Sequence, residues 1–399
     1  MSIQAHTDRP VCPKIRRQSK PRLLGLLGGV FFAAASLYAQ MTVDQAVGRF
    51  DQLVRNYNLI SFGNASFTNY GDTEGPLAVG GNLHLDGGSV GNSPAKYGVT
   101  SDPTLYVAGQ LTLNNFTHLN SGYASTPGLG GGYTWDATQR RLTGGGGTLS
   151  TSNSNNPLAS ADPRANPAPA NWSWSSLQSD LIAVSSVLAA APATGTIQIS
   201  GQTLQFVAPA GQTSGVVVFT LDMANFSGNL YDANGNKSFD QNNERVSNVQ
   251  INVPEGVAYV VNVINANGTT IFGGSGINFN AGTNNDQLLW NIVPDNDSAT
   301  ADSVRLGGGA SFYGSVLAPL VDLGNSGNVA INGQVVASSF TQSNAELHYL
   351  GFDSPVVFSP VPEPGTWGLG AILVVGGAIA FQHHRARRTA GRQPEQSRT

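Results

Sequence analysis

The chain has 399 residues, of which only 11% are charged, and its formal net charge is −4. Much of its basic charge lies at the two ends, since six of the 20 lysine and arginine residues precede residue 40 and five follow residue 364. The region 40–362 keeps nine basic residues against 21 acidic ones, so its net charge is about −12. A surface of this charge repels nucleic acid, and the composition argues against that class of partner.

The only cysteine is Cys12, in the basic N-terminal stretch, so disulfide bonds are excluded as a source of stability for region 40–362. That region is rich in Gly, Asn, Ser and Thr, with Val, Ile, Leu and Phe at alternating positions. This pattern predicts an all-β protein of many short strands and tight turns, and about 320 residues suffice for a large core.

The N-terminal segment has the layout of a secretory signal peptide. Its basic residues are Lys14, Arg16, Arg17, Lys20 and Arg22. An apolar run at 23–37 follows them, and small residues lead up to Ala39. We expect signal peptidase to cleave after Ala39 and remove 1–39; a permanent N-terminal membrane helix is the alternative.

Residues 42–57 predict a short helix. Thr42 and Gln45 have the spacing of a capping box at its start. The apolar residues that line one side of the helix are Val43, Val47, Phe50 and Val54.

A nine-residue pattern occurs twice in the part that follows. Residues 77–85 match 105–113 position by position, in the form apolar-x-apolar-small-Gly-amide-apolar-x-apolar. Residues 329–337 repeat most of this pattern, and 312–318 are a weaker copy. Such self-similarity indicates a structure built from repeated coils.

Gly314 and Gly333 lie 19 residues apart, about one turn of a β-solenoid. In such a coil alternate residues point inward, a glycine lets the chain turn between faces, and stacked coils share a core. Asn82 and Gln110 follow the glycines, and we expect each to hydrogen-bond its counterpart on the adjacent coil. A β-sandwich with glycine turns is the alternative.

Residues 120–171 are rich in Gly, Ser, Asn and Pro, and we interpret them as a long excursion from the coils. Residues 173–190 predict a helix that Ser173 caps and Pro192 ends. Its apolar positions are Trp174, Leu177, Leu181, Val184 and Leu188. A single amphipathic helix in a β-rich chain needs an apolar surface, which the flank of a solenoid offers.

Strands are predicted again after this helix, at 197–199, 204–206, 216–221 and 257–263. The last of these alternates Val257, Tyr259, Val261 and Val263 with other residues, which predicts a half-buried strand.

One cluster of oxygen side chains resembles a calcium loop. Asp232, Asn234, Asn236 and Asp240 have the spacing of its positions 1, 3, 5 and 9. Lys237 stands where that loop requires glycine, so a solvated turn rich in Asn and Asp is the alternative. No other cofactor is indicated.

A second acidic stretch, 286–302, contains Asp295, Asp297 and Asp302 close to Trp290. Two converging carboxylates beside an aromatic platform would suit a β-helix enzyme that modifies polysaccharides, as a lyase or hydrolase. We interpret the stretch as a loop and expect no enzyme.

Other catalytic signals are missing from the sequence. The three histidines of region 40–362 are His84, His118 and His348, which lack the spacing of metal ligands. No nucleophile elbow of the form Gly-x-Ser-x-Gly occurs, and no Gly-Lys-Ser/Thr follows a glycine run.

At the C-terminal end, Val361, Pro362, Glu363 and Pro364 precede an apolar run at 367–381, and the basic residues Arg385, Arg387 and Arg388 follow that run. This order resembles the PEP-CTERM sorting signal, which implies recognition and cleavage by a membrane-embedded exosortase. The run of about 15 residues is shorter than the roughly 20 of a comfortable membrane span, which favours transient insertion. The arginines should stay cytoplasmic, and an uncut anchor is the alternative.

Residues 77–82, 312–319, 332–335 and 346–348 together resemble the choice-of-anchor A family, an ice-binding-like adhesive domain, over residues 56–352. The resemblance implies a discontinuous right-handed β-solenoid with one long helix packed alongside. It supplies no catalytic residues.

We therefore expect an exported, non-enzymatic surface or matrix protein of a Gram-negative bacterium. Its domain at 40–355 should adhere to extracellular polysaccharide or cell-surface glycans through an extended face, and 356–399 should be the sorting signal. Ice binding is an alternative, but flat ice-binding faces carry stacked Thr-x-Thr rows, and only scattered threonines such as Thr112 and Thr117 occur.

Overall fold

The computed structural model describes residues 41–69, 71–98, 101–225, 246–272, 278–280, 282, 284–295, 301–307, 311–325 and 327–356. Residues 41–366 form one compact unit, which contains all the described helices and strands. No helix among these residues combines the length and apolarity needed to cross a membrane. The predicted signal peptide, and the sorting signal beyond residue 356, lie outside the described residues.

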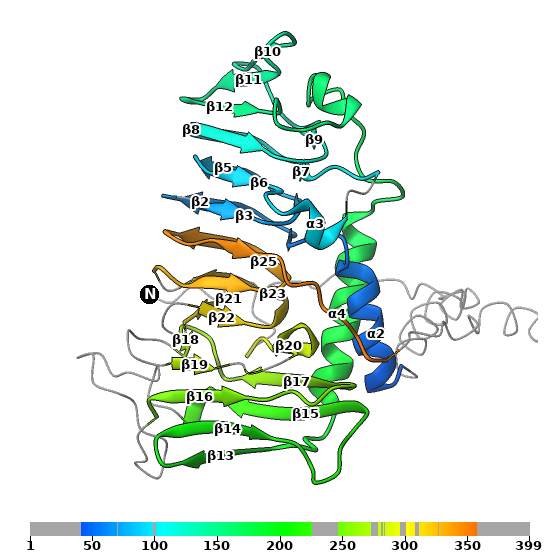
Figure 1. Ribbon diagram of the computed structural model, residues 1–399, viewed down its shortest axis with the longest axis vertical. Coiled ribbons are helices and arrows are strands. Elements are labelled where there is room, and N and C mark those ends of the chain that lie inside the picture. The colour runs from blue at the N-terminus through cyan, green and yellow to red at the C-terminus, as the bar shows by residue number, and fades with distance from the viewer. Residues whose placement is uncertain are drawn as a thin grey trace, which may run out of the picture. The chain divides into compact units, whose positions relative to one another are not determined.

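Parallel strands stack in coils and form three faces, which gives a β-solenoid-like fold (Figure 1). Face 1 consists of β15 (Gly215–Asp222), β17 (Val257–Ile264), β20 (Leu288–Ile292), the first parts of β23 (Ser315–Asn325) and β25 (Val335–Ser343), β1 (Leu59–Ser61), β4 (Leu77–Val79), β7 (Leu105–Val107) and β9 (Ala124–Ser125). Face 2 consists of β18 (Thr270–Ile271), β21 (Asp302–Leu306), the second parts of β23 and β25, β2 (Ala65–Thr68), β5 (Leu83–Asp86) and the start of β8 (Leu111–Leu119).

Face 3 holds two ladders. One contains β13 (Thr196–Ser200), β14 (Thr203–Val207), β16 (Asn248–Ile251) and β19 (Asn278–Asn280), and the other β22 (Ser311–Tyr313), β24 (Ala330–Asn332), β26 (Leu347–His348), β3 (Asp72–Thr73), β6 (Ser89–Val90) and the end of β8. Antiparallel pairing occurs only toward the ends of the described stack, where β13 pairs with β14 and β10 (Thr134–Asp136), β11 (Arg141–Gly144) and β12 (Gly147–Ser150) form a meander.

The chain builds the stack from the middle outward. It coils from β1 up to β12, returns beside face 1 as helix α4 (Trp174–Ala190), which contacts β17, β20 and β23, and then coils back from β13 to β25 (Figure 1). β25 closes the stack by pairing in parallel with β1, so Val335 lies beside Leu59. The solenoid is thus discontinuous in sequence, and two distant segments share one ladder.

The repeat predicted from the sequence is confirmed at its first two copies, where 77–85 and 105–113 are neighbours in register. The 19-residue turn is also confirmed, since Val316 lies beside Val335. The alignment of 329–337 with 77–85 is wrong, however. Gly333 turns the corner from face 3 to face 1, whereas Gly81 turns the corner from face 1 to face 2.

The amides after the glycines act differently from the prediction. Asn82 Oδ1 accepts a hydrogen bond from the backbone N–H of Gln110 at 2.9 Å, and Gln110 Oε1 accepts one from Gly130 at 3.0 Å. Each amide therefore binds the backbone of the next coil rather than its side chain. A side-chain ladder occurs elsewhere, where Asn153 donates to Asn120 and Asn120 to Asn92, at 2.8 and 3.0 Å.

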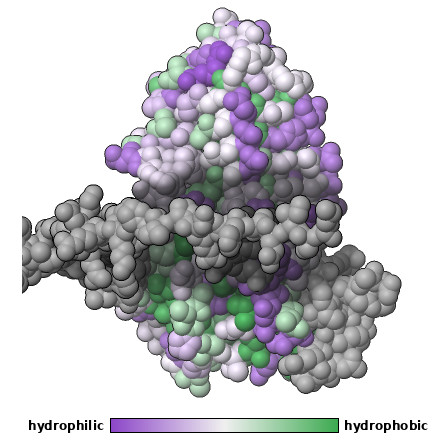
Figure 2. Space-filling view, turned by 180° about the vertical axis from the view of Figure 1, so that it is seen from behind, coloured by the Kyte–Doolittle hydropathy of each residue, from purple (hydrophilic) through white to green (hydrophobic). Residues whose placement is uncertain are grey.

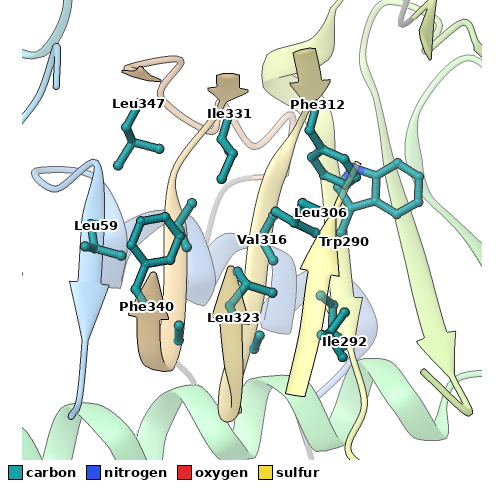
Figure 3. Close-up of a cluster of buried hydrophobic side chains, with 14 of the residues drawn as sticks. Leu59, Trp290, Ile292, Leu306, Phe312, Val316, Leu323, Ile331, Phe340 and Leu347 are labelled. Atoms are coloured by element: carbon teal, nitrogen blue, oxygen red, sulfur yellow. The ribbon is translucent and has the colours of Figure 1, made fainter. Parts of the chain in front are cut away.

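The interior of the stack is filled by inward-pointing apolar side chains from all three faces. Figure 3 shows Leu323, Phe340 and Ile331 pointing into this space from neighbouring strands, with helix α4 running outside them. Trp290 on β20 is fully buried here, with its ring centroid 5.2 Å from that of Phe312. One continuous core therefore joins both halves of the chain.

A second apolar cluster lies outside face 1, under helices α2 (Val43–Val54) and α4. The helix predicted at the start of the chain is confirmed as α2, with the capping box of Thr42 and Gln45 formed. Ser173 caps α4, which ends before Pro192. Because α4 covers face 1, β17 is buried on both sides, and the prediction of a half-buried strand there is wrong.

The segment 120–171, predicted as an excursion, is more regular than expected. Its middle folds into β10, β11 and β12, and β12 pairs in parallel with β8. Four glycines at 144–147 form the turn between β11 and β12, where the backbone comes too close to a neighbouring strand to admit a side chain at Gly147. A glycine-rich composition thus marks a tight meander here, not only a loop.

Candidate functional site

Two of the three faces are occupied by the protein itself. Helices α2 and α4 cover face 1, where the outward side chains of Ile60, Ala78 and Leu317 are buried. On face 3 the outward polar groups largely bond to one another. Asp72 accepts from Asn92 at 2.8 Å, and the ring of His348 lies 2.8 Å from both Asn332 and Glu346. Face 2 remains as the extended face with unsatisfied polar groups.

Charge on face 3 is also neutralised internally. Burial acts to raise the pKa of Glu74, but the hydrogen bond and charge of Lys96, whose Nζ lies 2.6 Å away, act together with the backbone N–H of Tyr349 and with His348 to hold the pKa below its ordinary value. The same carboxylate accepts a hydrogen bond from the backbone N–H of Tyr349 at 2.8 Å. Glu74 therefore joins the first and last coils of the chain and is engaged within the fold.

The outward residues of face 2 line up across the coils. This set, called the face 2 row below, consists of Arg305, Gly324, Thr341, Ser66, His84 and Thr112, each in register with the next. The side chains of Ser66, Thr341, His84 and Thr112 have no hydrogen-bond partner among the described residues. Their hydroxyl and imidazole groups can therefore bind an external ligand without breaking an internal bond.

The geometry of the row suits a repeating ligand. Neighbouring parallel strands lie about 4.8 Å apart, so the row presents five polar side chains across six coils, with one gap at Gly324. Gly324 is the one position of the row without a side chain, and a Cβ there would lie 3.1 Å from the carbonyl oxygen of Thr341 and 3.4 Å from Nη1 of Arg305. The guanidinium therefore lies close to Gly324, and it donates to the carbonyl of Asn325 at 3.3 Å. Hydroxyls with one cation in a shallow row can bond to a polyhydroxylated or acidic chain.

The rest of the surface is mixed. Figure 2, a view from behind, shows hydrophilic and hydrophobic residues interleaved, with hydrophilic residues prominent toward the end that carries β10–β12. At that end Phe116 is 38% exposed, and the guanidinium of Arg141 lies 5.4 Å from its ring centroid. Single exposed aromatic residues of this kind are ordinary on soluble proteins.

Several residues predicted as sites lie outside the described residues. These are the calcium candidates Asp232, Asn234, Asn236 and Asp240, the sorting residues Val361 to Pro364 with Arg385, Arg387 and Arg388, and the cleavage residue Ala39. Within the part of the chain that the structure describes, no group of three or more His, Cys, Asp or Glu side chains could hold a metal ion.

Of the residues named for a polysaccharide-cleaving site, Trp290 and Asp295 serve the fold, and Asp297 lies outside the described residues. Trp290, the candidate aromatic platform, is buried in the core, and its Nε1 donates to the carbonyl of Tyr313 at 2.8 Å. Asp295 accepts hydrogen bonds from the backbone of Ala266 and Asn267, at 3.1 and 2.9 Å. The alternative in which Trp290 forms an aromatic platform for a sugar is therefore wrong.

Sequence reasoning singled out Thr112 and Thr117 but missed the row to which Thr112 belongs. Thr117 is buried and donates to the carbonyl of Gly87 at 3.1 Å, so it takes no part in any outer surface. The signal for His84 and Thr112 was available, since both occupy the same outward position of the repeat. Ser66 and Thr341 could not be found this way, because they belong to no recognised copy.

The stack of parallel coils with one exposed polar face defines a β-solenoid-like protein. The chain belongs to the ice-binding-like adhesive domain family, whose model matches residues 50–349. Proteins with such domains are typically extracellular or attached to the cell surface. A comparison with curated proteins gives no match.

Among solved structures, the chain is similar to an ice-binding protein of an Arctic yeast, LeIBP (11% identity, 78% of this chain and 95% of that chain, TM-score 0.30). It is also similar to an ice-binding protein of the Antarctic ascomycete Antarctomyces psychrotrophicus (11%, 74% and 95%, 0.28) and to the DUF3494 domain of an ice-binding protein of Shewanella frigidimarina (12%, 75% and 95%, 0.29).

Proposed function

We propose that this protein is an exported, non-enzymatic adhesin that binds extracellular or cell-surface polysaccharide through the face 2 row. The observation that carries the proposal is the row itself, in which the side chains of Ser66, Thr341, His84 and Thr112 lack internal partners among the described residues. Membership of an adhesive-domain family supports the same conclusion. An extended row of weak polar contacts gives affinity through many simultaneous bonds to a long ligand, without a pocket.

The same proposal covers the narrower family, the source and the export route of the protein. The chain is a choice-of-anchor A protein of a Gram-negative bacterium, with a solenoid of right-handed coils. Signal peptidase removes 1–39, and exosortase cleaves at the PEP-CTERM signal after transient insertion of 367–381 into the inner membrane. The basis for these steps is the order of Val361 to Pro364, the short apolar run and the arginines.

Sorting is tested by replacing Pro362, Glu363 and Pro364 with alanine in an epitope-tagged full chain. We expect the variant to accumulate at full length in the inner membrane, while the wild-type chain is shortened and leaves the cell. Fractionation and immunoblotting measure both forms. A matched control replaces Gln396 and Ser397, two uncharged residues beyond the arginines, with alanine, which should change nothing. Equal processing of both variants would contradict the sorting proposal.

Adhesion is tested by the double substitution Ser66→Glu and Thr341→Glu. These residues are neighbours in register at the centre of the row. Two added carboxylates hold water tightly and repel acidic sugars, so we expect about tenfold weaker binding, or about 1.4 kcal/mol. Co-sedimentation of residues 41–366 with purified exopolysaccharide of the producing bacterium measures the effect.

The matched control is Thr134→Glu with Thr143→Glu, since these two exposed threonines are also neighbours in register but lie on the terminal meander. It should bind as the wild type does. Equal binding by both double variants would remove face 2 as the adhesive surface.

Ice binding is the second candidate, because the family is ice-binding-like. The face 2 row mixes a guanidinium, a glycine, an imidazole and three hydroxyls, and so lacks the uniform spacing of one small side chain. We therefore favour the glycan. A thermal hysteresis activity that the Ser66→Glu and Thr341→Glu variant loses would reverse this preference.

A further inference from the structure

The stack ends at a strand with an open edge. β13 pairs with β14 on one side, and no strand among the described residues pairs with its other side. Figure 1 shows β13 at the lower end of the stack. An open edge presents unpaired backbone N–H and C=O groups, and soluble proteins normally protect it with charged residues, proline or a bulge.

Among the described residues, β13 carries no such protection. It contains no charged residue and no proline, and its register with β14 has no bulge. None of the residues 181–221, which form the second half of α4, strands β13 and β14, and β15 except its last residue, is charged, although 11% of the whole chain is. In an acidic protein, an uncharged strand edge is a place where two copies can approach without repulsion.

The sequence of β13 reads almost the same in both directions. It is Thr196-Ile197-Gln198-Ile199-Ser200, with the amide at its centre, isoleucine on each side and a hydroxyl at each end. We infer that β13 is a self-association edge, at which two copies of the domain pair antiparallel about a two-fold axis through Gln198. In that arrangement isoleucine faces isoleucine and each threonine faces a serine.

The hydrogen-bonding pattern of the hairpin supports this axis. A two-residue turn, Gly201-Gln202, joins β13 to β14, so Ser200 and Thr203 form the hydrogen-bonded closing pair. Hydrogen-bonded and non-hydrogen-bonded pairs alternate along an antiparallel ladder. The backbone N–H and C=O groups of Ile197 and Ile199 therefore point away from β14, to the open side. Across the two-fold axis these two residues exchange four hydrogen bonds with their counterparts.

The side chains extend an existing ladder across the axis. Gln198 donates to Oε1 of Gln205 at 3.2 Å, and Gln205 donates to Gln250 at 3.4 Å. A second Gln198 would face the first at the non-hydrogen-bonded position, where side chains approach most closely. Five residues per copy bury less than the roughly 1,000 Å² of a stable interface, so the dimer is weak and concentration-dependent.

The test uses cysteine cross-linking of residues 41–366, which contain no cysteine of their own. In Gln198→Cys the two Cα atoms should lie about 4.5 Å apart, within the range of a disulfide, so mild oxidation should give a covalent dimer. Gln205→Cys and Thr196→Cys are matched controls, because their counterparts would lie about 14 Å apart and should not cross-link.

Sedimentation velocity provides the second measurement. The wild-type domain should shift toward a dimer as its concentration rises, and Gln198→Lys should stay monomeric, because two ammonium groups would meet on the axis. Residue 198 is exposed, so the Tm of both variants should match the wild type. A wild-type domain that stays monomeric at every concentration, or Gln198→Cys cross-linking no faster than Gln205→Cys, would overturn the inference.

Discussion

Replacing Trp290 with alanine is expected to destabilise the domain by about 3–5 kcal/mol. The indole is fully buried where the interiors of several coils meet, with ring centroids of Phe272 and Phe206 at 5.4 and 5.9 Å. Its removal leaves a cavity in a core that cannot collapse, since strands on all three faces are held by their ladders. It also leaves the carbonyl of Tyr313 without its 2.8 Å hydrogen bond. Urea denaturation of residues 41–366 measures the loss.

The control is Phe116→Ala, an aromatic-to-alanine change at a side chain that is 38% exposed. It should cost less than about 1 kcal/mol. If Trp290→Ala instead left the unfolding midpoint unchanged and removed polysaccharide binding, the tryptophan would be a contact residue. That result would restore the enzyme-like interpretation of the neighbouring acidic stretch.

Trp290 also shows where sequence reasoning fails. It is close to Asp295 and Asp302 along the chain, which suggested a sugar-binding cluster. Whether a strand residue points inward depends on the phase of the alternation, and a shift by one residue reverses the face. In β20 all five residues are buried, so periodicity does not fix that phase.

Local features of the fold could be predicted because their causes are local. The capping box of Thr42 and Gln45 joins residues three apart, and the two copies at 77–85 and 105–113 belong to coils that follow one another. β17 could also have been predicted as buried on both sides. Its outward positions include Ala258 and Val260, and a continuous apolar run of this kind is typical of a strand covered on both faces.

The junction between the two halves could not be predicted, because it joins residues far apart in the chain. Leu59 lies beside Val335 with nothing in either local sequence to indicate the pair. The face 2 row depends on the same junction, since Ser66 and Thr341 become neighbours only there. The sequence also does not show which corner of the coil a glycine turns, because Gly81 and Gly333 have similar sequence surroundings and turn different corners.

The substitution Gln334→Leu tests this junction. We expect it to lower the free energy of unfolding by about 3 kcal/mol. The side chain of Gln334 is 1% exposed and ties the start of the domain to its end. Its Nε2 donates to the carbonyls of Val54 and Tyr57, at 2.7 and 2.9 Å, and its Oε1 accepts from the backbone N–H of Phe352 at 2.7 Å. Leucine fills the space but leaves the carbonyl of Tyr57 and the N–H of Phe352 buried without partners.

Gln342→Leu makes the same chemical change a few residues away, but it should not destabilise the domain. Gln342 is also 1% exposed, but neither of its side-chain polar atoms has a partner in the described structure. Its burial is a cost that leucine removes, so we expect an unchanged or higher free energy of unfolding. Urea denaturation of both variants decides the matter: equal effects would mean that volume, and not the hydrogen bonds of Gln334, holds the two halves of the solenoid together.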